Sequence, residues 1–499
     1  MADLLITRAR IVEQHSSPGA PGPTDVRVAD GVVTEVAPGG ALAPSPGERV
    51  LEADGRWLIP GLWDQHVHMT TWAAFADRLD LSGTTSPAEV LRRVAPAIGA
   101  LGAAGVEPDR VLIGMGYRAS LWVEPASVAA LDEVTGPRPV ILISGDAHNG
   151  WMNTAALRAL GLPDRTGVLD ENDWFPVITR LAELPEGART EHDQVRRAMS
   201  GAAARGIVGI TDFEFASSHR IWPSRIAAGL NGLRVRAGFY EEALDEVLRS
   251  GMRTGDTLAG LVTLGPLKII SDGSLGTLTA HCCEPYAPSP DFPRGKQNVS
   301  PARLEHLLAT ANAAGLEVAL HAIGDRAVSD ALSAFAATGA TGSIEHAQLM
   351  RRADIGRMAT LGLRASVQPA HLLDDRDVTD RVWADRADRA FMLRSLTAAG
   401  VPLALGSDAP VSPLDPWLAI DAAVWRAEDG EKPWFPEERI TPAQALFAST
   451  DGAGPVRSGA LGDLVLLDDD PLRTRPRHVR VGATIVGGAP VFAAFDSSR

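Results

Sequence analysis

The chain has 499 residues, of which 45% are hydrophobic and 22% are charged, an ordinary globular balance. Its length suffices for a barrel-sized core with an accessory domain. The formal net charge of −15 excludes nucleic acid as the default partner, because phosphate binding requires a basic surface.

The N-terminus and the two cysteines indicate the cellular compartment. Asp3 and Arg8 interrupt the stretch that would form the apolar core of an export signal. No run reaches the roughly 18 apolar residues of a membrane helix. Cys282 and Cys283 are adjacent, and a disulfide between sequence neighbours is strained, so we expect reduced thiols. We therefore expect a cytoplasmic protein without a membrane partner.

Both ends of the chain have the pattern of short strands. The stretch DLLITRARIV precedes TDVRVADGVVTEVAP, in which Asp30-Gly31 has the composition of a tight hairpin turn. Near the other end, GALGDLVLLDDDP and HVRVGATIVGGAPVFAA are also short apolar runs punctuated by glycine. We predict one small β-sandwich domain built from residues 1–58 and 451–499, although two independent flaps have the same pattern.

The middle of the chain, residues 59–450, alternates short apolar runs with Ala/Leu/Arg-rich segments. In one such segment, Ser300-Pro301 predicts the start of a helix and Gly315 its end. This alternation predicts an α/β fold with a parallel sheet, and about nine units are close to the eight of a (β/α)8 TIM-like barrel. A doubly wound open sheet is the competing architecture. After the first run at Trp57, the apolar runs are RPVILISGD, GIVGITDFE, LRVRAGFY, GPLKIISDG, LEVALHAIGD, GSIEHAQ, LRASVQP and VPLALGSDAP.

His66 and His68 end the first of these runs, GLWDQHVH. Residues i and i+2 of a strand point to the same side, so the two imidazoles converge if this run is a strand. Two converging imidazoles form a metal-ligand pair, and zinc is the commonest metal for nitrogen ligands. The pattern is short, and taken alone it also fits two histidines in a polar loop.

Three more ligand-type side chains end later runs. His321 ends LEVALH, His346 ends GSIEH, and Asp408 ends VPLALGSD. Barrel enzymes keep their active sites at the C-terminal ends of the strands. The series therefore favours a metal site over scattered polar residues.

Lys268 lies inside the apolar run GPLKIISDG, where a charge is costly unless it is paired or removed. One explanation is an ion pair with Asp272 or with another acid at a strand end. The other is a carbamate, formed when the neutral amine reacts with carbon dioxide, whose two oxygens bridge two metals. The spacing alone does not choose between these explanations.

These residues and the stretches around them resemble the amidohydrolase superfamily. The matching features, in the family's order, are GLWDQHVH, a strand-borne Lys268, His321, His346 and GSDAP. The stretches LKIISDGSLGTLTA, LHAIGDRA, IEHAQL and LGSDAPV resemble its YtcJ-like branch, which includes N-substituted formamide deformylases. The resemblance covers nearly the whole chain, including ADGRWLIPGLWDQHVH and GALGDLVLLDDDP at its two ends.

The resemblance implies a pair of divalent metals at the strand ends. His66 and His68 would hold the more buried ion with Asp408, while His321 and His346 would hold the second. Two zinc ions are expected, and iron, manganese or nickel suit the same ligands.

The same resemblance implies chemical roles for Lys268 and Asp408. N6-carboxylated Lys268 would bridge the two metals, which would share a hydroxide made available near neutral pH. Asp408 would take the proton of this hydroxide as it attacks a carbonyl, and would pass the proton to the departing nitrogen.

Further residues carry weaker signals. His148, in ISGDAHNGWMN, resembles a family histidine that would donate to the substrate carbonyl or oxyanion, although a polar loop histidine has the same setting. Asp272 is expected to brace the lysine loop. Trp63 and Trp151 are candidates for an apolar substrate pocket, although each taken singly also fits the core. The segments EFASSHRIWPSR and HLLDDRDVTDRVW are candidate specificity loops.

The resemblance implies a hydrolase that cleaves a non-peptide carbon–nitrogen bond of a small amide or formamide by metal-bound hydroxide attack. A mononuclear barrel deaminase or an ester or lactone hydrolase is the alternative among enzymes, and Lys268 argues against the deaminase. A non-catalytic barrel binding protein is the alternative of another class, and its mark would be a lost ligand. The expected partners are a small-molecule substrate and, from family habit, a second copy of the chain.

Overall fold

The computed structural model describes two compact units, each with its own hydrophobic cores. One unit comprises residues 1–72 and 196–499, and the other comprises residues 73–195. The residues described are 3–13, 22–76, 78–117, 122–144, 149–169, 171–178, 180–181, 184, 190–215, 217–287 and 292–495.

The larger unit contains a barrel of eight parallel strands, each paired with the next one along the chain. The first and last strands meet through two backbone hydrogen bonds. The Asp408 N–H donates to the His66 carbonyl at 2.8 Å, and the His68 N–H donates to the Ala409 carbonyl at 2.9 Å. The predicted (β/α)8 barrel is therefore confirmed. The strands are β6 (Leu62–Val67), β11 (Ile207–Asp212), β12 (Arg234–Phe239), β14 (Val262–Ile270), β15 (Val318–Ala322), β16 (Gly342–His346), β17 (Arg364–Val367) and β18 (Leu403–Leu405).

Strand alternation separates an apolar face of the barrel from a polar one. Successive side chains of a strand point to opposite sides. In β14, Leu267 and Ile269 belong to the main hydrophobic core, while Lys268 between them lines a cavity. In β15, Leu320 is likewise a core residue and His321 lines the cavity. The polar side chains are therefore gathered on the side of the sheet away from the apolar packing.

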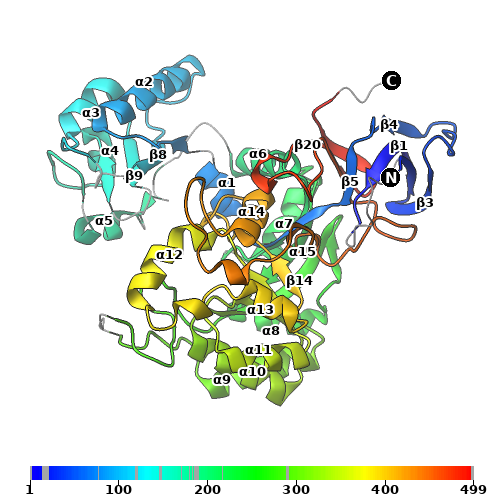
Figure 1. Ribbon diagram of the computed structural model, residues 1–499. Helices are drawn as coiled ribbons and strands as arrows, with labels where there is room; N and C mark the ends of the chain where they lie inside the picture. Colours follow the sequence, from blue (N-terminus) through cyan, green and yellow to red (C-terminus); the bar gives the residue numbers. More distant parts are fainter. Residues whose placement is uncertain are drawn as a thin grey trace. The chain divides into compact units, whose positions relative to one another are not determined.

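Helices connect the barrel strands. Helix α9 (Pro301–Ala313) begins after Ser300, whose hydroxyl accepts the backbone N–H of Arg303 at 3.3 Å, and Gly315 follows its end with φ of 71°. The predicted start and stop of this helix are confirmed. Figure 1 shows α9, α10 and α11 together, and α10 packs on both of the others. The other helices of this part of the chain are α1 (Met69–Ala76), α6 (Glu191–Ala203), α7 (Ser218–Ala227), α8 (Leu244–Ser250), α10 (Asp325–Thr338), α11 (Arg352–Thr360), α12 (His371–Val382), α13 (Leu393–Ala398), α14 (Pro416–Trp425) and α15 (Pro442–Ala448).

Both termini contribute to one eight-stranded sheet, in which the blue N-terminal strands lie beside the red β20 (Figure 1). Strand β5 joins the two halves, because it pairs with β1 on one side and with β19 on the other. Asp30 and Gly31, with φ of 49° and 78°, form the predicted turn between β2 and β3. The two ends therefore form one sheet domain. Its strands are β1 (Leu4–Ile11), β2 (Thr24–Ala29), β3 (Val32–Pro38), β4 (Arg49–Glu52), β5 (Trp57–Pro60), β19 (Leu464–Leu467), β20 (Val481–Val486) and β21 (Ala489–Ala493).

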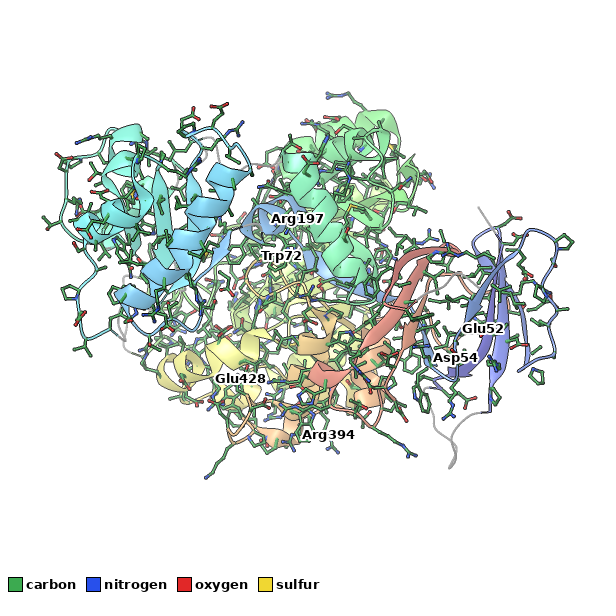
Figure 2. All side chains as sticks on the ribbon, turned by 90° about the horizontal axis from the view of Figure 1, so that it is seen from above. Glu52, Asp54, Trp72, Arg197, Arg394 and Glu428 are labelled. Carbon is green, nitrogen blue, oxygen red and sulfur yellow. The ribbon has the colours of Figure 1, made fainter. Side chains whose placement is uncertain are left out.

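Ion pairs on the surface of this sheet are exposed. Glu52 and Asp54 lie close together (Figure 2), and each has a carboxylate oxygen 3.3 Å from the same Arg8 nitrogen. Pairs of this kind are screened by water and contribute about 1 kcal/mol or less. The apolar core of this sheet, which includes Leu4 and Leu58, contributes more than these exposed pairs do.

The smaller unit has a separate four-stranded sheet in the order β10–β9–β8–β7. The run RPVILISGD, counted above among the barrel units, forms β9 of this sheet, so the barrel takes eight of the nine runs. A strand followed by a helix has the same sequence pattern in either sheet. Only the pairing of β9 with β8 and β10 shows that this run belongs to the smaller sheet. The range 59–450 therefore includes this separate unit. Its elements are β7 (Leu79–Asp80), β8 (Leu112–Tyr117), β9 (Val140–Ser144), β10 (Gly150–Met152), α2 (Pro87–Ala103), α3 (Val128–Thr135), α4 (Thr154–Ala159) and α5 (Glu171–Ile178).

Two further expectations concern the state of the cysteines and the presence of a membrane-spanning helix. Cys282 is buried, Cys283 is partly buried, and both are free thiols, as predicted. No helix among the described residues combines the length and the hydropathy that a membrane crossing requires.

The barrel closes where its last strand, β18, meets its first, β6, and we call this contact the seam. The seam leaves no space for a side chain at residue 406. A Cβ added to Gly406 would lie 2.9 Å from the backbone nitrogen of His66 and 3.1 Å from Oδ1 of Asp64. This Asp64 oxygen accepts the backbone N–H groups of His66 at 3.1 Å and Ser407 at 2.9 Å, so it ties the two strands together.

Gly406→Ala is expected to lower the free energy of unfolding by about 1–3 kcal/mol, because an added methyl group in a closely packed region forces backbone to move. Gly356→Ala, in the exposed part of α11, is the matched control, since its Cβ would meet no atom within 4 Å. Alanine there should leave stability unchanged or raise it by up to about 1 kcal/mol. Urea unfolding of both variants measures the difference, and a Gly406→Ala variant as stable as the wild type would contradict a tight seam.

Candidate metal centre

A cavity of about 520 Å³ lies at the C-terminal ends of the barrel strands. Pockets of this size accommodate small organic molecules. The structure brings all six metal ligands predicted from the sequence to the lining of this cavity. These residues are His66, His68, Lys268, His321, His346 and Asp408.

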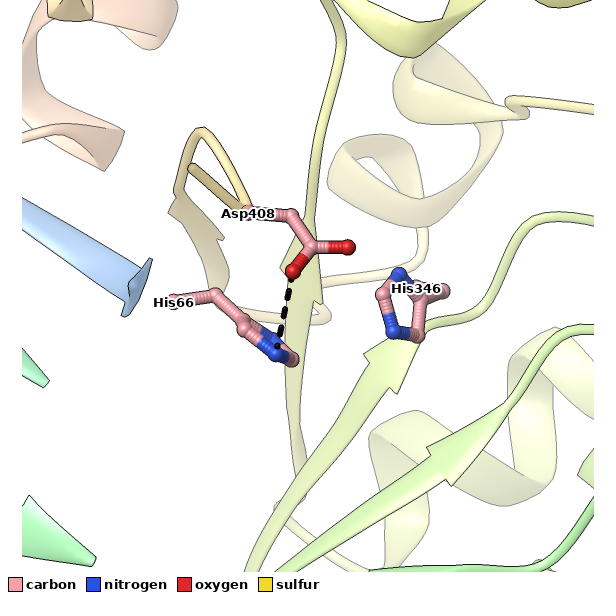
Figure 3. A group of neighbouring side chains, drawn as sticks. All are labelled: His66, His346 and Asp408. Carbon is pink, nitrogen blue, oxygen red and sulfur yellow. Dashed lines mark ion pairs between the residues drawn. The ribbon is translucent and has the colours of Figure 1, made fainter. Parts of the chain in front are cut away.

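His66, His346 and Asp408 form the tightest group among them. One ligand atom from each lies within 4.8 Å of those of the other two, and all three residues are buried. Figure 3 shows the Asp408 carboxylate facing both imidazole rings, with each residue supplied by a different strand end. Three strands distant in the sequence therefore supply one potential metal site.

The distances between the ligand atoms fit a divalent metal. Nε2 of His66 lies 3.5 Å from Oδ1 of Asp408 and 3.4 Å from Nζ of Lys268. Nε2 of His68 lies 3.4 Å from the same Asp408 oxygen. Ligands bound at about 2.1 Å in a tetrahedral arrangement are themselves about 3.4 Å apart. The spacing is therefore that of groups arranged around an ion.

Glu345 sets the orientation of His66. Its Oε2 lies 2.8 Å from Nδ1 of His66, and its Oε1 accepts the hydroxyl of Ser343. Burial raises the pKa of Glu345, but the hydrogen bonds from His66 and Ser343 and the charge of Lys268 outweigh burial and lower this pKa to about 2. An ionised carboxylate accepts the Nδ1–H, which leaves the Nε2 lone pair of His66 for a metal.

His321 and His346 are adjacent and neutral. Their ring centroids are 4.5 Å apart at an interplanar angle of 70°. Burial lowers the pKa of both imidazoles, that of His321 to about 3. Neutral imidazoles keep a lone pair for a metal. The division of the histidines between two ions stays a prediction, since His346 lies beside His321 and also belongs to the group with His66 and Asp408.

Lys268 reaches the centre as a buried side chain of β14. Its Nζ lies 4.7 Å from the ring centroid of Phe213. Burial lowers the pKa of the Lys268 amine to about 8, although the charges of Glu345 and Asp408 act in the opposite direction. A neutral amine is therefore accessible near neutral pH, and the carbamate of Lys268 stays a prediction.

Asp272 connects the segments that follow β14 and β15. Its carboxylate accepts the backbone N–H groups of His281 at 2.8 Å, Ile323 at 3.1 Å and Gly324 at 2.9 Å. Its Oδ1 also lies 3.4 Å from Nε2 of His321. Burial raises the pKa of Asp272 to about 7 against these backbone donors. This geometry supports a bracing role beside His321.

The two tryptophans predicted to bind the substrate, Trp63 and Trp151, are not among the residues that line this cavity. Trp63 packs against Arg236, with the guanidinium carbon 4.5 Å from the ring centroid, and donates its indole N–H to Thr211. Trp151 is fully buried in a core of the smaller unit. Both are core residues, which is the alternative that the sequence left open for each. His148 lies outside the described residues.

Several residues that line the cavity or support its lining were missed at the level of sequence. Glu345 lies between Ile344 and the predicted ligand His346, and a charge at this place in a strand is a weaker form of the signal used for Lys268. The two candidate specificity loops are largely helices, α7 and α12, and the second begins with His371, which lines the cavity. Phe215 stacks on His68 and on Tyr240, with centroids 5.0 and 5.4 Å apart, and no pattern in the sequence indicated this.

Comparison with known proteins connects this geometry with a family. A model described as the amidohydrolase family matches residues 49–492. The putative amidohydrolase YtcJ of Bacillus subtilis (strain 168) is 28% identical over 90% of this chain and 91% of that protein. An N-substituted formamide deformylase of Arthrobacter pascens is 26% identical over 92% of each chain. The resemblance predicted from the sequence is confirmed.

Two further similarities extend over almost the whole chain. The protein LONG AFTER FAR-RED 3 of Arabidopsis thaliana is 28% identical over 99% of this chain and 92% of that protein. The crystal structure of an uncharacterized metal-dependent hydrolase from Pyrococcus furiosus has a TM-score of 0.76 and 24% identity, and covers 95% of this chain and 100% of that chain. The second similarity supports the fold.

Glu345→Gln is expected to weaken metal binding about 10- to 100-fold, because a neutral amide holds the Nδ1–H of His66 less strongly than a carboxylate does. Competition with a chromophoric chelator measures the affinity. Glu305→Gln, on the exposed face of α9, makes the same chemical change away from the cavity and should bind metal as the wild type does. Equal affinity in Glu345→Gln and Glu305→Gln would show that Glu345 does not support His66.

Proposed function

The chain belongs to the amidohydrolase family of metal-dependent hydrolases, and from this premise we propose that it cleaves a non-peptide carbon–nitrogen bond of a small amide or formamide. The observation that carries the proposal is the convergence of His66, His346 and Asp408 in a cavity of about 520 Å³. The similarity to a protein described as an N-substituted formamide deformylase supports formamides as the first substrates to test.

The residues present fit divalent metal ions. Neutral imidazoles and an ionised carboxylate are donors that zinc and related ions prefer, and they lie at ligand spacing. When bound, such ions polarise a carbonyl group and make water nucleophilic near neutral pH. The proposed ligands of two zinc ions are His66, His68, Lys268, His321, His346 and Asp408.

We propose that Lys268 carries a carbamate. The Lys268 ammonium first loses one proton, and the neutral amine then forms a nitrogen–carbon bond to carbon dioxide and releases a second proton. A buried cation thereby becomes an anion. An anion beside several metal ligands replaces a buried ammonium that has no carboxylate within ion-pair distance among the described residues. The carbamate oxygens would give Lys268 anionic donor atoms that could hold divalent metals.

Asp408 is the proposed proton carrier. Burial raises the pKa of Asp408, but His66, His68 and His346 outweigh burial and hold this pKa well below its ordinary value. The ionised carboxylate accepts a proton from the water that attacks the substrate carbonyl. It then delivers this proton to the nitrogen as the carbon–nitrogen bond breaks, so the products are a carboxylic acid and an amine.

A panel of N-substituted formamides and acetamides tests the proposed reaction, with release of the free amine as the readout. Asp408→Asn is expected to lower kcat by about 10²- to 10⁴-fold, because it removes the proton carrier. Asp245→Asn, on the exposed side of α8, should retain full activity. A chelator should abolish turnover and added zinc should restore it. Hydrolysis of matched esters without hydrolysis of any amide would contradict the proposed bond.

The metal content of Lys268→Ala tests the bridging role. The wild type is expected to hold about two ions per chain, and the variant one or none, because two-metal sites depend on their shared ligands. Lys296→Ala removes an exposed lysine from a loop and should leave the metal content unchanged. One ion per chain in both the wild type and Lys268→Ala would rule out the bridge and favour a mononuclear, deaminase-like mechanism.

A further inference from the structure

One wall of the cavity is acidic beyond the metal ligands. Asp374 and Asp375 line it from the first turns of α12. Among the described residues that line the cavity, Lys268 is the one lysine or arginine. Its Nζ lies 3.4 Å from Nε2 of His66, so this amine belongs to the metal centre. Apart from Lys268, the described residues of the lining therefore offer no lysine or arginine side chain to a substrate anion.

Asp375 is held in place at this wall. Its Oδ2 accepts the side-chain N–H of Gln348 at 2.8 Å, and Gln348 itself lines the cavity from the segment after β16. The carboxylate is partly withdrawn from solvent, and burial raises the pKa of Asp375. A carboxylate with reduced hydration gains more from a nearby cation than a fully hydrated one does.

His371 supplies an independent sign of a ligand. It begins α12, one helical turn before Asp375, and its ring is stacked 6.4 Å from the ring of His346. Its Nε2 is buried and has no hydrogen-bond partner among the described residues. Buried polar atoms are nearly always paired, so a polar group of a ligand in the cavity would satisfy this nitrogen.

The remaining lining is mainly apolar. Phe215 and Val411 are 65% and 66% exposed, and both line the cavity with Ile270 and Leu275. A carbon skeleton packed against these side chains would reach both the metal ligands and the acidic wall of α12. The cavity thus combines an apolar lining with one polar wall whose charge is negative.

We propose that the cavity selects small amides or formamides that carry a protonated amine, which pairs with Asp375, and discriminates against those that carry a carboxylate. A substrate carboxylate would face Asp374 and Asp375, and like charges at close range disfavour binding. The inference rests on the proposed function, because it assigns the amide group of the substrate to the metal ligands.

Three formamides of similar size test this selection: N-formyl-1,3-diaminopropane, 3-formamidopropan-1-ol and N-formyl-β-alanine. They share the formamide and differ in an ammonium, a hydroxyl or a carboxylate at the other end. The metal-loaded wild type is expected to prefer the ammonium compound over the carboxylate by about tenfold or more, in Kd by calorimetry and in kcat/KM. The hydroxyl compound should lie between them.

Asp375→Asn is expected to reduce this preference to about threefold or less, because it removes the charge and keeps the shape. Asp374→Asn, at an exposed position on the same wall, should reduce it partly and does not disturb the contact with Gln348. Asp377→Asn is the matched control, since Asp377 is 89% exposed on the same helix and should leave the preference intact.

The outcomes separate the two proposals. Hydrolysis of all three compounds with equal kcat/KM, or a preference that survives Asp375→Asn, would overturn charge selection and leave amide hydrolysis standing. Preferential binding of the ammonium compound without hydrolysis of any of the three would support charge selection and contradict hydrolysis of these formamides. Absence of binding by all three would overturn charge selection.

Discussion

The backbone hydrogen bonds between the first and last barrel strands hold together the two ends of the candidate metal centre. The Asp408 N–H donates to the His66 carbonyl, and the His68 N–H donates to the Ala409 carbonyl. Asp64 reinforces this seam by accepting backbone N–H groups from both sides. The candidate ligands on β6 and after β18 are thus positioned by backbone hydrogen bonds, so closure of the barrel sets the spacing between His66, His68 and Asp408.

Burial of many ionisable groups in one place is costly unless they compensate one another or bind an ion. The imidazoles of His66, His321 and His346 stay neutral because burial lowers their pKa values. Glu345 and Asp408 stay ionised because their neighbours outweigh the effect of burial. Neutral imidazoles beside ionised carboxylates are good donors for divalent metals. Burial of these groups costs stability, and it also keeps the imidazoles neutral, as metal binding requires.

Helix α12 lines the same cavity as the candidate metal ligands. It follows the strand β17, and segments at the C-terminal ends of barrel strands build the active sites of this fold. Its first residues, His371 and Asp375, face the same cavity as the ligands, while Phe215 and Tyr240 form a stack on His68. The cavity therefore has an apolar stack beside the candidate ligands and a polar wall at the start of α12.

The sequence by itself determined the strands of the barrel and the five ligand-type residues that end their runs, because apolar runs that end in polar side chains are local patterns. It also indicated that Lys268 is unusual, since a charge inside such a run is costly. Only the tertiary structure decided that β9 belongs to another sheet, that Glu345 orients His66, and that His371 lines the cavity. These facts depend on which strands pair and which side chains meet across the barrel, and such contacts between distant residues leave no periodicity along the chain.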